Sequence, residues 1–491
     1  MYKSDLKPLF HFILAALFML IGSQSYAKSN GCGKRSLIKF RSKWPSIEEE
    51  VNFYDCFYEK GIPSISLPGF IKVALRSKDP SLQDELIGKA LEDVPRKYEV
   101  FLFKSLINKK MLLSPKVSSD LMYFFALRMF DQKNIKSSLK YLSKQVGIDF
   151  PRYGQSLFLK AVIMTKLGKL NEAESIFSQL ATGNFKTNNK ETKSNLISMS
   201  KLNLSRIKIE LGDYKSAVDQ YRDISFRDNL WFDGLVEMSW TMISKGDYEG
   251  AIGNASFIEK STSSFIYKPW PSAIESIGLL KICQYPNAKK TVERFSSQYK
   301  DTGDVTLKHL KKNSDKSWYQ YAAEVLDTKL SKSNSKKTPP LLFYAARSNA
   351  VIGQQKLLNE LFDEEEKLLK MKKKFRRSKQ SYVFKLVSKR LNTIGRNIKS
   401  AQKKMGYTFR DKIKSLLKEY YNLQKIVDVV GFEIFARSSD SITMRVAGKK
   451  FIDEMKKAGN KSASWNFNGE FWADEAGRFR SLLENKCAKL E

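Results

Sequence analysis

Three short stretches in the middle of the chain share one pattern: Leu-Gly-Lys-Leu-Asn-Glu-Ala at 167–173, Leu-Gly-Asp-Tyr-Lys-Ser-Ala at 211–217 and Lys-Gly-Asp-Tyr-Glu-Gly-Ala at 245–251. Each stretch has glycine in second place, leucine or tyrosine in fourth and alanine in seventh. A glycine after a helix permits the left-handed backbone that ends the helix, and a small alanine lets two helices approach closely. The pattern therefore predicts a turn between two packed helices, repeated along the chain.

The repeat extends beyond these three copies. A weaker fourth copy has Cys283 at the glycine position, and a degenerate copy upstream has Ser138 at the alanine position. Successive alanines stand 44, 34 and 37 residues apart. The positions that define the repeat are Gly168, Ala173, Gly212, Tyr214, Ala217, Gly246, Tyr248, Ala251 and Ala288.

A period of about 34 residues with these motifs resembles the tetratricopeptide repeat family, from about residue 155 to 300. The resemblance implies an all-α fold, an α-α superhelix in which helix pairs stack on their neighbours and present a concave surface to a partner. A helical pattern continues upstream from Phe70 to Leu113, where the repeat signature is lost. We interpret that region as divergent repeats or as an N-terminal cap.

The N-terminus reads as a secretory signal peptide. Two lysines precede an apolar stretch from Leu9 to Ile21, and small residues at Ser25 and Ala27 fit a cleavage site after Ala27. The apolar stretch is shorter than the roughly 20 residues that span a bilayer, so a retained membrane anchor is the alternative that we do not favour. We expect an exported protein of the bacterial periplasm or one associated with the outer membrane.

The formal net charge is +34 and is carried mostly by lysine. Such a surface attracts polyanions without specific contacts, because the lysine ammonium is a hydrated point charge and lacks the planar, bidentate geometry of the arginine guanidinium. The alternative is that the lysines bind no partner and only keep the protein surface solvated. Because the chain is expected to be exported, we do not expect nucleic acid as a partner.

The second half changes character after a polar, breaker-rich segment at 331–340, which we interpret as a linker. Apolar residues from Phe384 to Met405 then follow a three-four spacing, the seam of a coiled coil. The tripeptide at 406–408 predicts a helix stop and a new start, and the seam resumes from Ile413 to Val430. We favour an antiparallel hairpin turning at Gly406, with a helix around 357–375 as a third member. The alternative is one continuous helix in an intermolecular coil, through which the chain could form an oligomer.

These patterns divide the chain into a signal peptide (1–27), an N-terminal helical region (28–115), a repeat solenoid (116–330), a linker (331–340), a basic coiled-coil region (341–450) and an aromatic-acidic tail (451–491). The tail has three aromatic residues at Trp465, Phe467 and Phe471 followed by Trp472 and two acids. We expect this tail to dock on the solenoid, because exposed tryptophans are costly.

The chain has four cysteines. Cys283 lies within the repeat pattern, so we predict a buried free thiol there. Cys32 and Cys56 are the pair closest in sequence that could form a disulfide. Alternatively, Cys487 could form a disulfide that holds the C-terminus against the rest of the chain. The spacing does not choose between them.

Catalytic patterns are not found. The segment after the signal peptide has a single histidine, His309, and no glycine-rich phosphate loop or nucleophile motif. We therefore expect no catalytic residue, no metal and no cofactor. Lytic transglycosylases need only one glutamate, so Glu275 beside Ser276 is the one place where an enzyme could be sought, although it lies inside the fourth repeat.

The sequence thus predicts a non-enzymatic interaction scaffold of the cell envelope that binds an envelope protein or peptide on the concave surface. Partner contacts are expected at Trp231, Trp240 and Tyr221. The alternative is a protein that binds an anionic surface directly through its lysines, such as lipopolysaccharide, phospholipid or a wall polymer.

Overall fold

The computed structural model describes residues 46–92, 96–228, 230–261, 269–312, 317–326, 339–378, 381–438 and 477–487. Within these ranges the chain is helical and contains no strand, which confirms the predicted all-α class. The predicted signal peptide (1–27), Cys32 and most of the predicted linker and tail, including 465–475, lie outside the described residues. No helix in the described ranges combines the length and the apolar character needed to cross a membrane.

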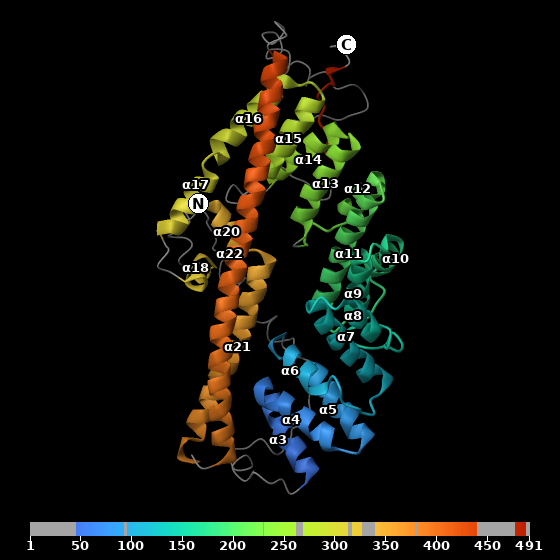
Figure 1. Cartoon of the computed structure of the whole chain (residues 1–491), viewed down its shortest axis with the longest axis vertical. Coiled ribbons are helices and arrows are strands. Elements are labelled where there is room, and N and C mark those ends of the chain that lie inside the picture. The colour runs from blue at the N-terminus through green and yellow to red at the C-terminus, as the bar shows by residue number, and fades with distance from the viewer. Residues whose placement is uncertain are drawn as a thin grey trace, which may run out of the picture.

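The helices follow one another in two series. The N-terminal helices are α3 (Ile47–Glu59), α4 (Pro63–Arg76), α5 (Pro80–Glu92), α6 (Arg96–Leu106), α7 (Pro115–Asp131) and α8 (Ile135–Leu142). The repeat region contains α9 (Tyr153–Lys166), α10 (Leu170–Ala181), α11 (Lys190–Glu210), α12 (Tyr214–Arg222), α13 (Trp231–Lys245), α14 (Tyr248–Ser261), α15 (Trp270–Lys281) and α16 (Tyr285–Tyr299). From α7 to α16 each helix packs on the next, so the region is an α-solenoid that rises through Figure 1.

The turns inside the helix pairs have one geometry. Gly168, Gly212 and Gly246 adopt φ angles of 73°, 80° and 84°. In each turn the glycine N–H bonds to the carbonyl three residues back, and the next N–H bonds to the carbonyl five residues back. This is a Schellman motif, in which the left-handed residue closes the first helix. The second helix then begins two residues after the glycine, at the leucine or tyrosine of the sequence pattern.

The same turn occurs where the glycine is replaced. Cys283 and Lys133 take left-handed φ angles of 55° and 61° with the same pair of backbone hydrogen bonds. Gly61, between α3 and α4, repeats the geometry upstream of the recognisable sequence signature. Five residues after each of these turns lies a small side chain that is fully buried: Ser66, Ser138, Ala173, Ala217, Ala251 and Ala288. Close helix approach at these positions is therefore common to the whole solenoid.

The first helices of the pairs form the inner row of the superhelix. Helices α9 and α11 contact each other, as do α13 and α15, whereas the described residues show no contact of this extent between successive second helices (α10, α12, α14 and α16). A curved stack brings the members of its inner row closer together than those of its outer row. The concave surface is therefore lined by α9, α11, α13 and α15.

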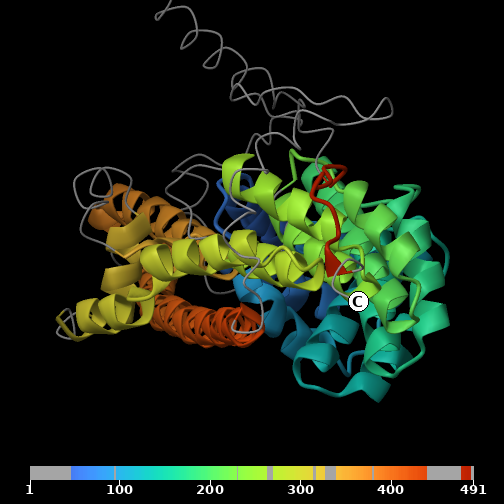
Figure 2. The same ribbon diagram turned by 90° about the horizontal axis from the view of Figure 1, so that it is seen from above.

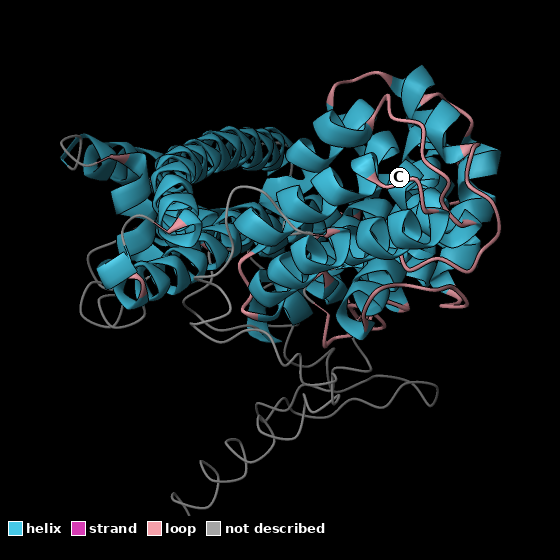
Figure 3. Ribbon diagram, turned by 90° about the horizontal axis from the view of Figure 1, so that it is seen from below, coloured by secondary structure: helices cyan, strands magenta, loops and turns pink. Residues whose placement is uncertain are grey.

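A long helical hairpin follows the solenoid. After α17 (Thr302–Lys312), α18 (Trp318–Leu326) and α20 (Pro340–Ala346), helix α21 (Asn349–Lys374) packs along α22 (Tyr382–Ser438), with the short helix η1 (Arg376–Ser378) in the turn. The C-terminal half of α22 packs on α15 and α16, and the turn end of the hairpin lies beside α3 and α4 (Figure 1). Seen from above and from below, the hairpin lies across the open side of the superhelix (Figures 2 and 3). It is a strut that joins the two ends of the solenoid.

The predicted helix stop at Gly406 is wrong, because α22 runs without a break through this residue. A Cβ atom at Gly406 would lie 2.8 Å from the backbone nitrogen of Tyr319 and 3.0 Å from Cβ of Trp318. The glycine is thus required for the close approach of α18 and does not end the helix. The hairpin turns at 375–381 instead, and the predicted third member is its first arm. The seam, including Val387, Ile394 and Met405, is buried within this single chain.

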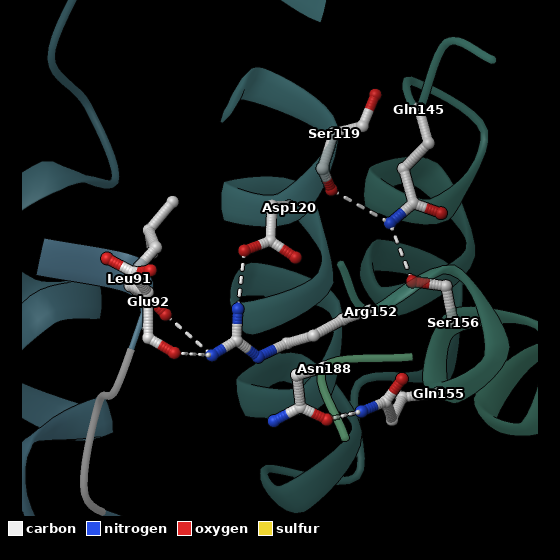
Figure 4. Close-up of polar contacts among 9 residues, drawn as sticks. All are labelled: Leu91, Glu92, Ser119, Asp120, Gln145, Arg152, Gln155, Ser156 and Asn188. Carbon is white, nitrogen blue, oxygen red and sulfur yellow. Dashed lines mark hydrogen bonds and ion pairs between the residues drawn. The ribbon is translucent and has the colours of Figure 1, made fainter. Parts of the chain in front are cut away.

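Arg152, just before α9, ties the repeat region to the N-terminal helices (Figure 4). Its guanidinium donates to the Asp120 carboxylate of α7 and to the carbonyls of Leu91 and Glu92 at the end of α5. It also lies 4.7 Å from the ring centroid of Phe124. Both charged groups are buried, and the cation lies at the negative end of the α5 dipole. The joint therefore fixes α5, α7 and α9 together.

Glu364 on α21 ties the strut to the start of the solenoid. It is 2% exposed and accepts hydrogen bonds from the Ser64 backbone N–H at 2.7 Å and from the Tyr98 hydroxyl at 2.8 Å. Burial, together with the negative charge of Glu364, raises the pKa of Tyr98, so this hydroxyl stays a donor throughout the physiological range. Phe53 of α3 packs on Tyr382 of α22 at 6.0 Å beside this contact.

Candidate partner-binding face

Two neighbouring helices of the inner row present stripes of solvent-accessible side chains. On α11 the stripe consists of Met199, Asn203, Arg206 and Glu210, and on α13 it consists of Asp233, Glu237, Trp240 and Ser244. In both helices the spacing is four, three and four residues, which keeps the side chains on one face. We call these eight residues the inner face.

An ion pair joins the two stripes. Arg206 donates to both carboxylate oxygens of Glu237, at 2.8 and 2.6 Å, and its pKa is raised chiefly by this hydrogen bonding. The hydroxyl of Tyr221, on α12, donates to the same carboxylate at 3.0 Å. Burial and the Glu237 charge raise the pKa of Tyr221, which keeps it protonated. Glu237 is therefore held in one orientation on the inner face.

Asp233 is the remaining acid on the α13 stripe. Its pKa is raised by partial desolvation and by the nearby charge of Glu237, while Lys412 of α22 acts in the opposite direction. Below this stripe, Trp270 of α15 donates from its indole nitrogen to Glu419 of α22 at 2.6 Å. The inner face thus looks toward the strut and carries an acidic pair that would gain from an added cation.

The three predicted contact residues are not equivalent in the structure. Tyr221 is 2% exposed, so its ring belongs to the core and its hydroxyl only positions Glu237. Trp231 is partly buried and packs edge-on against Phe257 at 6.1 Å. Trp240 is partly buried and lies on the inner face itself. The acidic pair Asp233 and Glu237 was missed, although the four-residue spacing on the first helix of a repeat could have indicated it.

The C-terminal segment 477–487, which we call the strap, lies on the outside of the last repeats. Phe479 stacks on Phe257 at 4.9 Å, and the Ser481 N–H bonds to the carbonyl of Glu249 at 2.9 Å. The strap can lie this close to α14 because residue 253 is a glycine: a Cβ atom there would lie 2.4 Å from the Phe479 carbonyl oxygen. The described part of the predicted tail therefore docks on the solenoid.

A disulfide fixes the far end of the strap. Cys283 is bonded to Cys487, with 5.1 Å between the Cα atoms. The predicted free thiol at Cys283 is therefore wrong, because the strap brings Cys487 to this turn, whereas its predicted burial is confirmed by an exposed fraction of 8%. Cys56 is buried and disulfide-bonded, while Cys32, which we predict as a candidate partner, precedes the described residues.

We expect a digest made without reduction to contain the Cys283 peptide joined to the Cys487 peptide, and a second linked pair containing Cys56 and Cys32. Peptide mapping by mass spectrometry before and after reduction measures both pairs. A peptide that joins Cys56 to Cys487 would contradict the structure.

Docking of the strap is expected to weaken in acid below about pH 4. Burial of Asp247 favours the neutral acid, but bidentate contact with Arg480 at 2.7 and 3.0 Å outweighs it and lowers the pKa of this carboxyl. A lowered pKa contributes stability above the ordinary value of about 3.9, and that stability is lost as the pH falls further. Hydrogen exchange of 477–487, corrected for intrinsic rates, should be constant from pH 8 to 5 and increase below about pH 4. Asp247→Asn should remove this step, and loosening that begins above pH 5 would contradict the assignment.

A cavity of about 310 Å³ lies between the strap and the helices α12 to α14. Its wall is mixed. Charged groups come from Asp219, Arg222, Asp223, Arg478 and Arg480, and apolar surface comes from Met242 and Phe479. Arg222 is already used, because it pairs with Asp219 at 2.8 Å and donates to the carbonyl of Gly477 at 3.0 Å. The cavity is thus largely a by-product of strap docking.

The structure gives no support to chemistry at Glu275. This carboxylate pairs with Arg294 on α16, and the Ser276 hydroxyl donates to the Ala273 carbonyl at 2.8 Å within its own helix. Desolvation raises the pKa of Glu275, with Arg294 opposing it. Neither residue lines the cavity at the strap. Among the described residues, no group of three or more His, Cys, Asp or Glu side chains is placed to hold a metal ion.

Comparison of the chain with models of protein families and with curated proteins found no match.

Proposed function

We propose that this chain is an exported scaffold of the tetratricopeptide repeat type, which binds a protein or peptide partner in the bacterial cell envelope without catalysing a reaction. The observation that carries the proposal is the inner face. Two consecutive first helices present accessible stripes that are joined by Arg206 and Glu237, and a half-buried Trp240 lies beside an acidic pair. The signal-peptide pattern supports the envelope location.

The chemistry of the face defines the partner. Asp233 and Glu237 favour a lysine or arginine side chain, since an added cation stabilises the ionised form of Asp233, whose pKa is raised by desolvation and by the charge of Glu237. Trp240 offers apolar surface of the kind that dominates binding energy at interfaces. A helix or extended peptide with a basic residue next to an apolar one fits both features.

Site-specific photo-crosslinking in cells that make the protein tests the proposal. A crosslinking residue at Met199 or Ser244 on the inner face should capture one discrete envelope protein, and the same residue at Lys136 or Lys215 on the outer helices should not. Both inner positions are exposed, so the substitutions leave the core intact.

A charge reversal then tests the acidic pair. Asp233→Lys should reduce partner binding at least tenfold at physiological ionic strength, because it adds a cation where the partner supplies one. Asp131→Lys, at the exposed last residue of α7, is the matched control and should bind normally. Equal crosslinking from inner and outer positions, or normal binding by Asp233→Lys, would overturn the proposal.

A further inference from the structure

The outward side of α22 carries an unusual set of cations. Between residues 367 and 410 the chain has 16 basic residues and no acidic one. Five of them on α22, together with Lys414 further along the same helix, are exposed and are not in an ion pair within the described part of the chain: Lys385, Lys389, Arg396, Lys399, Lys403 and Lys414. At about 100° per residue all six lie within roughly 40° of one line along the helix. We call this line the outer stripe.

The outer stripe lies on the side of α22 opposite to its buried seam, and further along the same line Tyr421 contacts Gly303 of α17. Val387, Ile394 and Met405 are fully buried and lie roughly opposite it on the helix wheel. The α22 residues that interact with the solenoid point the same way as this buried seam, among them Glu419, which accepts from Trp270. The cations of the outer stripe therefore do not attach the strut to the solenoid.

The same line ends in exposed apolar side chains. Phe432 is 73% exposed and lies about 20° from Lys385 around the helix, and Val429 beside it is 61% exposed. On the other side of this last part of α22, Val430 and Ile434 are buried against α15 and α16. A large exposed phenylalanine at the end of a cationic line is not needed for packing.

We propose that the outer stripe of α22 docks on an anionic phospholipid surface, with the helix lying along the bilayer, its lysines at the headgroups and Phe432 in the interface. Helices that lie on membranes combine a cationic face with apolar side chains that enter the boundary of the acyl region. A linear polyanion would satisfy the cations but would leave Phe432 in water. The six cations span roughly 44 Å from Lys385 to Lys414 at 1.5 Å per residue, so several headgroups contribute together. Phe432 follows roughly 27 Å further along the same line, after the exposed acid Asp428.

This proposal is independent of the inner face, which lies on α11 and α13 and looks toward the opposite side of α22. Both can act at once. A protein held on a membrane by the outer stripe would keep the inner face open to a soluble partner.

Flotation of the full chain with vesicles of phosphatidylcholine, with and without phosphatidylglycerol, tests the proposal. We expect binding only to the vesicles with phosphatidylglycerol and loss of that binding at about 1 M salt, where the Debye length is about 3 Å. The triple variant Lys389→Glu, Arg396→Glu, Lys399→Glu should bind at least 100-fold more weakly, because each cation near such a surface contributes about a fivefold gain. Its matched control is Lys136→Glu, Lys160→Glu, Lys215→Glu on the solenoid, which has the same net charge and should bind much more strongly than the stripe variant.

A second variant separates a bilayer from a soluble polyanion. Phe432→Ser should weaken vesicle binding about tenfold, since a buried phenylalanine contributes of this order. Binding to inorganic polyphosphate should not change. Leu112→Ser, at another highly exposed apolar site, should have no effect on either. Two outcomes would overturn the proposal: equal vesicle binding by the two triple variants, or vesicle binding that Phe432→Ser leaves unchanged.

Discussion

Replacing Asp120 by alanine is expected to lower the free energy of unfolding by about 3–5 kcal/mol, because it leaves the Arg152 guanidinium buried without a counter-charge. The exposed fractions of the two side chains are 7% for Arg152 and 5% for Asp120, so water cannot replace the lost carboxylate. Two backbone carbonyls at the end of α5 remain as acceptors. They stabilise the cation less than an ionised carboxylate does. Chemical denaturation followed by circular dichroism measures the change.

Two variants make this prediction specific to the buried pair. The double variant Asp120→Ala, Arg152→Met should be more stable than Asp120→Ala alone, because the unpaired buried charge is gone. Glu172→Ala removes a pair with Lys169 in which both side chains are 53% exposed, and it should change stability by less than about 0.5 kcal/mol. A loss below about 1 kcal/mol for Asp120→Ala would mean that the pair is not buried in solution.

Glu364→Ala is expected to release the strut from the start of the solenoid. The variant leaves the Ser64 N–H and the Tyr98 hydroxyl buried without an acceptor, which costs about 2–4 kcal/mol. The loss should be local, because the other end of the strut remains packed on α15 and α16. Hydrogen exchange should therefore accelerate in α3 and α4, and remain unchanged in α9 to α12.

Glu366→Ala is the matched control for this experiment. Glu366 is two residues away and, within the described ranges, pairs with Lys370 on the solvated side of α21. Its removal should leave the exchange of α3 and α4 as it is in the parent chain. If hydrogen exchange in Glu364→Ala accelerated uniformly along the whole solenoid, the strut would stabilise the entire fold and not only its first helices.

The repeat turns could be predicted from the sequence because they are local. A glycine, a leucine or tyrosine and an alanine at fixed spacing determine a turn and the close approach after it, and the structure shows this at Gly168, Gly212 and Gly246. The turn at Lys133 could not be predicted from residue type, since a lysine is rarely left-handed. There, packing of the neighbouring helices imposes the backbone conformation.

The course of the second half depended on contacts that are distant in sequence. Gly406 has the features of a helix end, yet it is retained inside α22 because α18 packs directly on it. In the same way, Cys283 resembles a small core residue until the strap, 204 residues later, is seen to reach it. Neither outcome is contained in the local pattern.

The candidate site was predicted only as a region. The stacked helix pairs were expected to present a concave surface, but the choice of aromatic residues selected Tyr221, which is buried, and overlooked Asp233 and Glu237. A tyrosine at helical spacing is as compatible with a core as with a surface. The curvature that decides between them is a property of several stacked helices together.

The strut has a consequence for the order in which the chain acquires its structure. Solenoids can ordinarily assemble from one end to the other, because each pair needs only its neighbour. Here the acceptor for Ser64 is a carboxylate 300 residues further on, so the first pair receives its last partner only when most of the polypeptide has been synthesised. Non-local pairing of this kind slows folding and prolongs the exposure of apolar surface. The first helices, α3 and α4, with Phe53 and Phe57 in their core, are thus the part that most needs protection by a chaperone until the strut has packed against them.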